Sequence, residues 1–279
     1  MMSFGTELTL GSKTLLAQGH IGNLYRVDTP RQKGVLKTSQ THPEHLAIEA
    51  KMLQELQEHG ITTPKVLLLN EHGLLMEYIE TTPLSAQKEE AFALEILTKL
   101  HAIDNPDRVY GYYYNTPIGP LIQNNEQTQY NWALFLGQMR LIPMAKLCYE
   151  AQRIDKKTYL HIETLANTLY KRIDMRHIYP TLIHGDLWRG NILFHEQGAT
   201  LIDPALYYAD REMEIASLLM HKMFSQRFFD SYHEQNPLSE TFYSEKVYLY
   251  QLYPLLLHEF LYPQKYRQRI QKVLAKLPL

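Results

Sequence analysis

The sequence predicts an α+β fold in two lobes, a small antiparallel sheet with one main helix followed by a larger and mostly helical part. Two observations lead to this prediction. Short apolar runs separated by glycine-containing turns fill residues 14–39, which is typical of antiparallel strands. From about residue 84 onward, apolar residues mostly recur with helical spacing. Strands and helices are therefore segregated along the chain, which argues against the alternating order of a doubly wound parallel sheet.

The first lobe is expected to span residues 1–80, with its boundary near Glu80–Pro83. The segment LLAQGHIGNLYRVDT indicates a strand, a turn and a second strand, and KGVLKTS indicates a third strand. A helix is predicted from Pro43 to Gly60, because apolar residues follow a helical period between a proline that can open a helix and a glycine that can end it. TTPKVLLLNEHGLLMEYIE then predicts a hairpin with strands at 65–69 and 74–79.

The second lobe is expected to span residues 81–279. KEEAFALEILTKLHAI predicts an amphipathic helix, whereas the Tyr-, Asn-, Pro- and Gly-rich residues 105–130 predict a long irregular segment. The remaining predicted elements are helices at about 131–150 and 155–175, short strands within 181–203, and mainly helices within 210–275.

Composition excludes several classes of protein. The sequence has 28 Lys and Arg against 30 Asp and Glu, so electrostatic capture of nucleic acid or of an anionic membrane is not indicated. Cys148 is the only cysteine, which excludes a disulfide within the chain and fits a reducing compartment. The start, MMSFGTELTLGSKTLL, lacks a signal-peptide pattern, and no apolar run approaches the roughly 20 residues of a membrane span. We expect a cytoplasmic globular protein without nucleic-acid or membrane partners; its oligomeric state is unknown.

The segment TLIHGDLWRGNILF carries the densest group of polar residues between apolar runs. Asn191 lies five positions after Asp186, and Asp203 follows two short predicted strands joined by a tight turn. Because a hairpin brings its ends together, Asn191 and Asp203 are expected to meet, with Asp186 close by. Carboxylate and amide oxygens are ligands that suit Mg²⁺. The spacing matches a phosphoryl-transfer site in which the first Asp orients the acceptor hydroxyl and the Asn and second Asp hold the metal. The alternatives are an ordinary inter-strand loop and a metal-dependent hydrolase.

The first lobe contains partners that such a site needs. Lys37, at the end of a short strand, is placed to bind nucleotide phosphates, and Glu49 on the next helix to hold that lysine. Gly19 and Gly22 lie in a turn whose amides can cradle phosphate. Backbone groups from Glu77 through Tyr78 to Ile79 are candidates for binding an adenine edge. Lys37 could instead be a solvated lysine, and Glu49 an exposed charge on the helix. The segment from Glu77 to Ile79 could be an ordinary edge strand.

With these parts in place, the sequence resembles the fructosamine kinase (ketosamine 3-kinase) family, relatives of aminoglycoside and choline kinases within the protein-kinase-like fold. The family motif H-G-D-L-W-x-G-N stands complete at His184 to Asn191, and IDPALYYADREMEIA resembles the family's later segment. Further likeness lies in GYYYNTPIGPLIQNNEQTQYNWALFLGQMR and in the closing helices, and it covers about residues 14–270. The chain departs from the family by having Gly22 where a larger polar residue is usual and Leu257 where an Asn is common.

The resemblance implies an ATP- and Mg²⁺-dependent kinase that phosphorylates a sugar hydroxyl, O3, of ketosamines such as ribulosamines or fructosamines, either free or on glycated protein lysines. It implies that Asp186 is the base, that Trp188 shapes the acceptor pocket and that His258 contacts the acceptor. From their position after Asp203, Tyr207 and Tyr208 are candidates for lining the acceptor side, although tyrosines in such runs are more often half-buried core residues. His101 is interpreted as a packed helix-end histidine. Asp210 and Glu212–Glu214 either orient the loop or begin the next helix, and the helix start is the preferred interpretation. The rival interpretations are an aminoglycoside- or choline-type kinase and a non-catalytic nucleotide-binding module.

Overall fold

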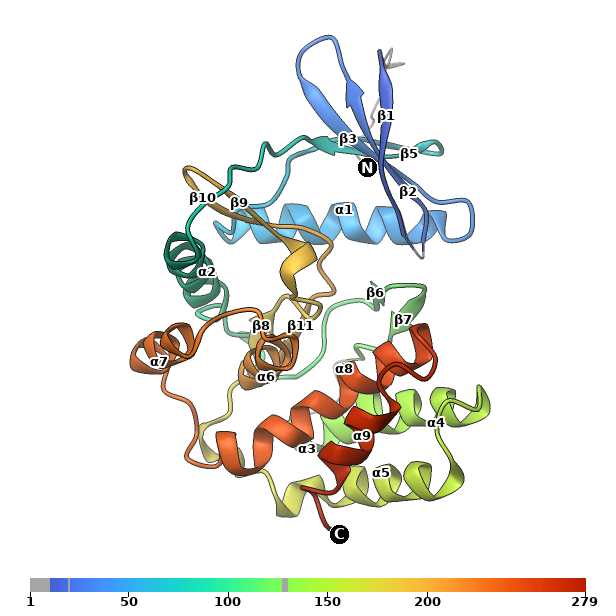
Figure 1. The fold of residues 1–279 in the computed structure, drawn as a ribbon, viewed down its shortest axis with the longest axis vertical. Helices are drawn as coiled ribbons and strands as arrows, with labels where there is room; N and C mark the ends of the chain where they lie inside the picture. Colours follow the sequence, from blue (N-terminus) through green and yellow to red (C-terminus); the bar gives the residue numbers. More distant parts are fainter. Residues whose placement is uncertain (1–10, 20, 127–129) are drawn as a thin grey trace. The chain divides into compact units, whose positions relative to one another are not determined.

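The structure is a computed structural model that describes residues 11–19, 21–126 and 130–279 (Figure 1). The first ten residues, on which the prediction about a signal peptide depends, lie outside the described residues, as do 127–129 of the predicted irregular segment. The chain forms two compact units. The first contains Met1–Lys99, Thr116–Ile122 and Arg189–Leu206, and the second contains Leu100–Asn115, Gln123–Trp188 and Tyr207–Leu279. The lobe boundary near Glu80–Pro83 stays a prediction.

The first unit is built around a five-stranded antiparallel sheet with the order β1-β2-β3-β5-β4. The predicted strands, helix and hairpin of this region are confirmed, with ends that shift by at most a few residues. The helix stops just before Gly60, whose φ of +76° suits a glycine at a helix end. The elements are β1 (Lys13–Gln18), β2 (Asn23–Asp28), β3 (Lys33–Thr38), α1 (Pro43–Glu58), β4 (Val66–Asn70) and β5 (Gly73–Glu77).

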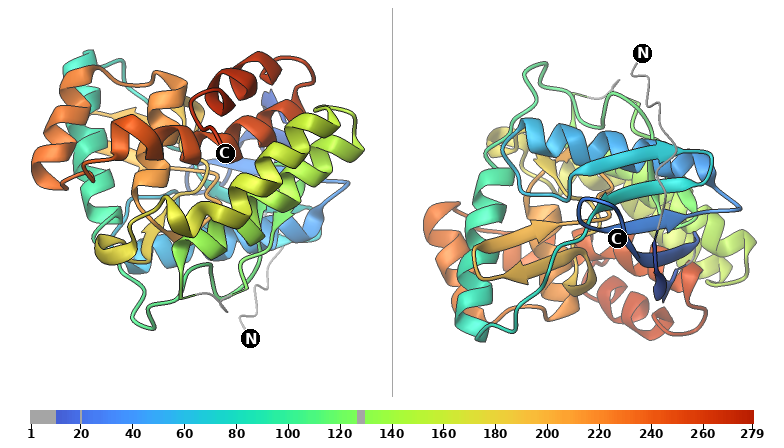
Figure 2. Two further views of the ribbon diagram at one scale, coloured as in Figure 1. Left: turned by 90° about the horizontal axis from the view of Figure 1, so that it is seen from below. Right: turned by 90° about the horizontal axis from the view of Figure 1, so that it is seen from above.

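Helix α1 covers one face of this sheet, as the view from above in Figure 2 shows. Side chains alternate across β5, so Leu74 and Met76 pack against Leu46 and Leu53 of the helix, whereas Leu75 lies in the cluster on the other face. The apolar contacts between β5 and α1 fix the orientation of the helix. They thereby fix where its polar residues point.

Three later segments complete the first unit, namely a helix, the residues Thr116–Ile122 and a hairpin. Helix α2 (Ala86–Leu100) begins soon after the sheet, and the hairpin of β9 (Ile192–His195) and β10 (Gly198–Leu201) returns from much later in the sequence. The Thr82 N–H donates to the Phe194 carbonyl at 3.0 Å, and the Leu201 N–H donates to the Thr62 carbonyl at 2.9 Å. These bonds attach the hairpin to the unit that carries the sheet.

The second unit is mostly helical, as predicted. Its long helix α8 (Val247–Leu261) packs against α4, α6 and α9. A two-stranded ladder joins β8 and β11, with Leu182 opposite Tyr208. The elements are α3 (Trp132–Phe135), α4 (Ile142–Glu150), α5 (Lys156–Thr168), β8 (Thr181–Ile183), β11 (Tyr207–Ala209), α6 (Glu212–His221), α7 (Gln226–Gln235) and α9 (Arg267–Leu274).

Two predictions about this part of the chain need correction. The predicted helix at 131–150 is interrupted by a π-helical stretch, Leu136–Leu141, which separates α3 from α4. The segment 105–130 was expected to be irregular, but it contains the short strands β6 (Thr116–Ile118) and β7 (Leu121–Gln123), which pair with each other. Strands of three residues leave too little periodicity in the sequence to be recognised.

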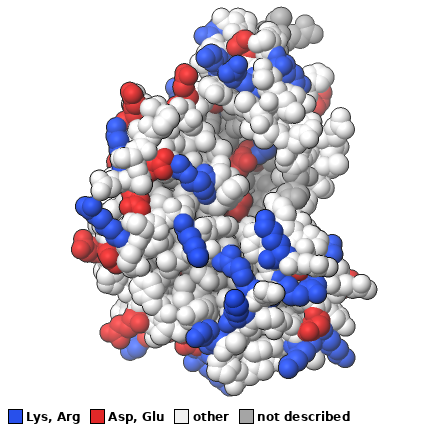
Figure 3. Space-filling model, viewed as in Figure 1, with Lys and Arg blue, Asp and Glu red and all other residues white. Residues whose placement is uncertain are grey.

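Charged side chains of both signs are interspersed on the face shown in Figure 3, with Lys and Arg gathered over its lower part. Helix α9 explains part of this pattern, because Arg267 and Lys272 are exposed while Ile270 and Val273 are buried. Helix α9 is thus amphipathic, with Arg267 and Lys272 on its exposed face. Among the described residues, no helix is both long and apolar enough to cross a bilayer.

Candidate active site

Lys37 joins two carboxylates in the first unit. Its Nζ lies 2.7 Å from Glu49 Oε2 and 2.8 Å from Asp203 Oδ1. Lys37 comes from β3, Glu49 from the buried face of α1, and Asp203 from the residues after β10. The predicted Lys37–Glu49 pair is therefore present. The sequence did not predict that Asp203 would contact the same ammonium group.

The electrostatics of this cluster follow from its burial and its charges. Burial alone would lower the pKa of Lys37, but the charges of Asp203 and Glu49 and their hydrogen bonds raise it, so the lysine stays protonated. Burial raises the pKa of Glu49 and the Asp203 charge adds to this, whereas the charge and hydrogen bond of Lys37 lower it. One carboxylate oxygen of Glu49, Oε1, is buried without a hydrogen-bond partner. By contrast, the side chain of Asp203 is 46% exposed, so it can exchange Lys37 for another cation at small desolvation cost.

The hairpin that leads to Asp203 has the predicted form. Ile192 pairs with Leu201, and the Ile202 N–H donates to the Asn191 carbonyl at 3.1 Å. The ends of the hairpin therefore meet, and Asn191 and Asp203 leave it at the same end. Asp203 has a φ of +53°, in the left-handed region that Asp and Asn tolerate better than most residues.

In the second unit, Asp186 lies on the loop that follows β8. Gly185 before it has a φ of +83°, which turns the chain sharply after the strand. The Asp186 N–H donates to His184 Nδ1 at 3.3 Å, and His184 itself is fully buried. The turn at Gly185 and the hydrogen bond to the buried His184 together fix the backbone of Asp186.

A buried acid that the sequence analysis did not assign to the site anchors this loop. Glu214 of α6 is 2% exposed and accepts hydrogen bonds from the N–H groups of His184, at 3.2 Å, and Gly185, at 3.0 Å. His101, at the end of α2, places Nε2 3.1 Å from the same carboxylate and Nδ1 2.7 Å from the Tyr232 hydroxyl. Burial alone would raise the pKa of Glu214, but the bonds from His101 and Gly185 and the histidine charges lower it. Glu214 is therefore held as a carboxylate that orients the loop.

For Glu214 the preferred interpretation, a helix start alone, is therefore wrong, and the alternative that it orients a loop agrees with its hydrogen bonds. His101 is buried at a helix end as expected. One sequence feature pointed to Glu214. It stands between Met213 and Ile215 in a helix with many apolar residues, and an acid on a buried face needs buried partners.

The predicted acceptor residues have different surroundings. Trp188 is 43% exposed, which leaves its ring accessible. Tyr207 is 1% exposed and packs on Phe135, with the Arg140 guanidinium 4.2 Å from its ring centre, so direct contact with an acceptor would require this packing to open. His258 stacks on Tyr266, and burial together with nearby positive charges lowers its pKa to about 4. The acceptor roles of these three residues stay predictions.

The predicted nucleotide-binding segments already have internal partners. The Gly19 N–H donates to the Gly22 carbonyl at 2.8 Å, which closes the turn between β1 and β2. A Cβ at Gly22 would lie 1.7 Å from the Thr38 carbonyl oxygen, so this glycine is required by close backbone approach. The N–H groups of Glu77 and Tyr78 donate to the carbonyls of Lys65 and Lys33. An adenine edge would therefore have to use the carbonyls of this segment or the backbone of Ile79.

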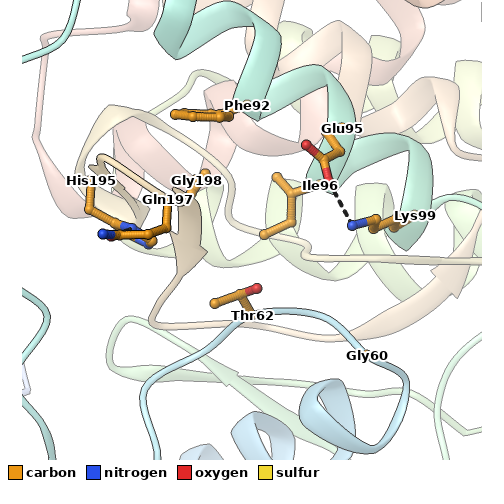
Figure 4. Close-up of a pocket in the computed structure, with 10 residues that line it drawn as sticks. Gly60, Thr62, Phe92, Glu95, Ile96, Lys99, His195, Gln197 and Gly198 are labelled. Carbon is orange, nitrogen blue, oxygen red and sulfur yellow. Dashed lines mark hydrogen bonds and ion pairs between the residues drawn. The ribbon is translucent and has the colours of Figure 1, made fainter.

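A small pocket elsewhere in the first unit contains none of the predicted site residues. It measures about 170 Å³ and lies between α2 and the β9–β10 turn (Figure 4). Phe92 and the Glu95–Lys99 ion pair line one side, and His195 lines the other. Because none of its lining residues is a predicted site residue, the pocket is not assigned to the predicted chemistry.

Comparison with known proteins identifies the family of the chain. The fructosamine kinase family model matches residues 2–279. The chain belongs to the fructosamine kinase family. A probable ketoamine kinase of Enterococcus faecium is 29% identical over 279 residues, which cover 96% of each chain. A probable ketoamine kinase of Pasteurella multocida is also 29% identical, over 91% of this chain and 88% of its own.

Solved structures show the same fold. A crystal structure from Haemophilus somnus, provisionally named a fructosamine-3-kinase, has a TM-score of 0.85 at 26% identity and covers 99% of this chain and 94% of its own. An ADP-bound aminoglycoside phosphotransferase has a TM-score of 0.64 at 16% identity and covers 96% of this chain and 92% of its own. The predicted protein-kinase-like fold is therefore confirmed. Family and fold together assign the chain to the phosphotransferases.

Proposed function

We propose that this protein is an ATP- and Mg²⁺-dependent kinase that phosphorylates a sugar hydroxyl, O3, of ketosamines. The observation that carries the proposal is the cluster of Lys37 with Glu49 and Asp203, since a buried lysine held by two carboxylates at these positions is what a nucleotide phosphate site requires. Family membership supports the ketosamine as acceptor. The reducing compartment expected from a single cysteine supports a cytoplasmic location, where ATP is available.

The residues of the first unit fit the groups that this reaction needs. Asn191 and Asp203 would hold Mg²⁺, because an amide and a carboxylate supply hard oxygen donors and the Asp203 side chain is half exposed. Lys37 would bind the nucleotide phosphates, with Glu49 orienting its ammonium group. When bound, the metal would neutralise charge on the phosphates. The turn of Gly19 and Gly22 is the candidate phosphate cradle.

The residues of the second unit would act on the acceptor. Asp186 would accept the proton of the attacking hydroxyl, which requires an ionised carboxylate at a fixed position. Glu214 and His184 supply that fixed position through the backbone of the loop. Trp188 would shape the pocket beside the sugar, and His258, neutral above pH 5, would contact the acceptor as a hydrogen-bonding group.

ATP consumption against a panel of acceptors tests this function. The panel contains a ribulosamine, a fructosamine, an aminoglycoside and choline, with glycated protein as a fifth acceptor. We expect turnover with the ketosamines, and the glycated protein shows whether a lysine-linked sugar is accepted. Turnover restricted to the aminoglycoside or choline would favour the aminoglycoside- or choline-type kinase that the distant fold neighbours represent.

Asp186→Asn is the control for this assay. It removes the base but keeps the shape of the side chain, so we expect turnover to fall by about 10³-fold or more with nucleotide binding nearly unchanged. Binding is measured by calorimetry with a non-hydrolysable ATP analogue. Wild-type turnover in this variant would rule out the assignment of Asp186 as base. Nucleotide binding without turnover in the wild type, on every acceptor, would favour a non-catalytic module.

A further inference from the structure

We propose that His42, Glu44 and His45 form a binding site for a transition-metal ion such as Zn²⁺, separate from the predicted Mg²⁺ site. These residues lie at the start of α1, within the first unit. Each offers one ligand atom, and the three atoms lie within 4.8 Å of one another. The proposal does not depend on the proposed catalytic function.

The distances suit a small divalent cation. His42 Nδ1 lies 3.6 Å from Glu44 Oε1, and His45 Nε2 lies 3.8 Å from the same oxygen. Two ligands of a tetrahedral zinc ion, at bond lengths of about 2.0–2.1 Å, stand about 3.3 Å apart. The two contacts with Glu44 therefore need to close by only a few tenths of an ångström, whereas the two imidazoles also have to change their relative orientation.

The burial of one ligand also suits a metal. The His45 side chain is 3% exposed. Its Nδ1 has no well-aligned hydrogen-bond partner, although the Gly119 backbone interacts with this imidazole, so the hydrogen-bonding capacity of the ring is only partly used. Its other nitrogen faces the Glu44 carboxylate.

One movement is required for both imidazoles to bind the same ion. The rings of His42 and His45 are nearly parallel, 12° apart, with their centres 4.7 Å from each other. A coordinated metal lies in the plane of each imidazole, so one ring has to turn out of this stack. His42 can do so, because its side chain is 33% exposed and Glu44 beside it is 62% exposed. Two imidazoles and one carboxylate favour Zn²⁺, Ni²⁺ or Cu²⁺ over Mg²⁺, which prefers oxygen ligands alone.

The site adjoins the structure that supports the nucleotide turn. The Ser39 hydroxyl donates to the Ile21 carbonyl at 2.7 Å and accepts from the His42 N–H at 2.9 Å. His45 lies one helical turn before Glu49, on the same buried face of α1. A metal bound here would fix the first turn of the helix that carries the partner of Lys37.

Zinc titration by calorimetry tests the proposal. The full chain is titrated with ZnCl₂ in the presence of millimolar MgCl₂, which saturates oxygen-donor sites and leaves imidazole sites free. We expect one equivalent to bind and the melting temperature to rise. The variants His42→Gln and Glu44→Gln change exposed side chains and should weaken binding about tenfold or more, or about 1.4 kcal/mol.

His72→Gln is the matched control. His72 also lies beside a glutamate, with Nε2 3.7 Å from Glu71 Oε1, but the described residues place no second imidazole with this pair. We expect its zinc binding to equal that of the wild type. The proposal is overturned if the wild type does not bind zinc or if binding is lost when Mg²⁺ is added. It is also overturned if His72→Gln weakens binding as much as His42→Gln does.

Discussion

Replacing Glu214 by glutamine tests whether this buried carboxylate orients the loop of Asp186. The carboxylate accepts the N–H groups of His184 and Gly185, one on each oxygen, at 3.2 and 3.0 Å. A glutamine has nearly the same shape, but its NH₂ group would face one of these two backbone N–H groups. Two donors cannot form a hydrogen bond with each other. One buried N–H then loses its partner, at a cost of about 1–3 kcal/mol, and the other bond loses its charge, at about 1 kcal/mol. We expect a loss of about 2–4 kcal/mol in the free energy of unfolding.

Thermal unfolding and steady-state kinetics measure the two consequences. For a chain of this size the stability loss corresponds to a decrease of about 4–16 °C in the melting temperature. Turnover should fall as well, with nucleotide affinity unchanged, because the affected loop carries Asp186. Glu234→Gln on α7 is the control, since Glu234 is exposed and its substitution should leave both values unchanged. A Glu214→Gln protein with the melting temperature and turnover of the wild type would refute the anchoring role.

Three further outcomes follow from the structure. Gly22→Ala should lower the melting temperature clearly, because its Cβ would collide with the Thr38 carbonyl. Gly19→Ala is the control and should be tolerated, because the nearest atom to its Cβ is 3.7 Å away. Equal effects of the two substitutions would contradict the close-approach argument. Asp203→Asn should raise the Mg²⁺ concentration needed for half-maximal turnover and weaken nucleotide binding, and an unchanged metal titration would count against its role as a ligand. His258 is kept neutral in the folded chain, with a pKa of about 4, and gains a proton near pH 6.5 when unfolded, so stability falls by about 2–3 kcal/mol between pH 6.5 and 4. Urea unfolding of His258→Gln should lack this part of the acid dependence, and identical pH profiles would show that the lowered pKa is wrong.

The parts of the site that lie on regular elements were predictable from sequence. Helical spacing placed Glu49 on the buried face of α1, and hairpin geometry brought the ends of β9 and β10 together. Both are local rules, since the apolar period decides which face is buried and a short turn decides which strand ends meet. The ion pair between Lys37 and Glu49 follows once those two elements pack.

The parts that depend on long-range packing were not predictable. His101 and Glu214 are 113 positions apart, and no spacing rule relates them. The same is true of the short strand pair β8 and β11, which the bridge from Gly111 to Tyr208 extends. The π-helical stretch at 136–141 contains Gly137, where a Cβ would lie 2.7 Å from the Ala166 carbonyl oxygen, and this approach to a residue far along the chain has no local sequence signal. Tertiary contacts decide such features. A single sequence does not show which distant residues will contact each other.

The backbone at Asp203 has a consequence for mutational scans of this protein. With a φ of +53°, this position accepts glycine and asparagine more easily than alanine, and branched side chains such as valine least easily. Glutamate, the usual charge-preserving replacement, would therefore be among the less tolerated choices, although it keeps the negative charge. In a library of all replacements at this codon, protein abundance should follow backbone tolerance and turnover should follow side-chain chemistry. Asparagine and glycine should then stand out as well-expressed variants with impaired turnover.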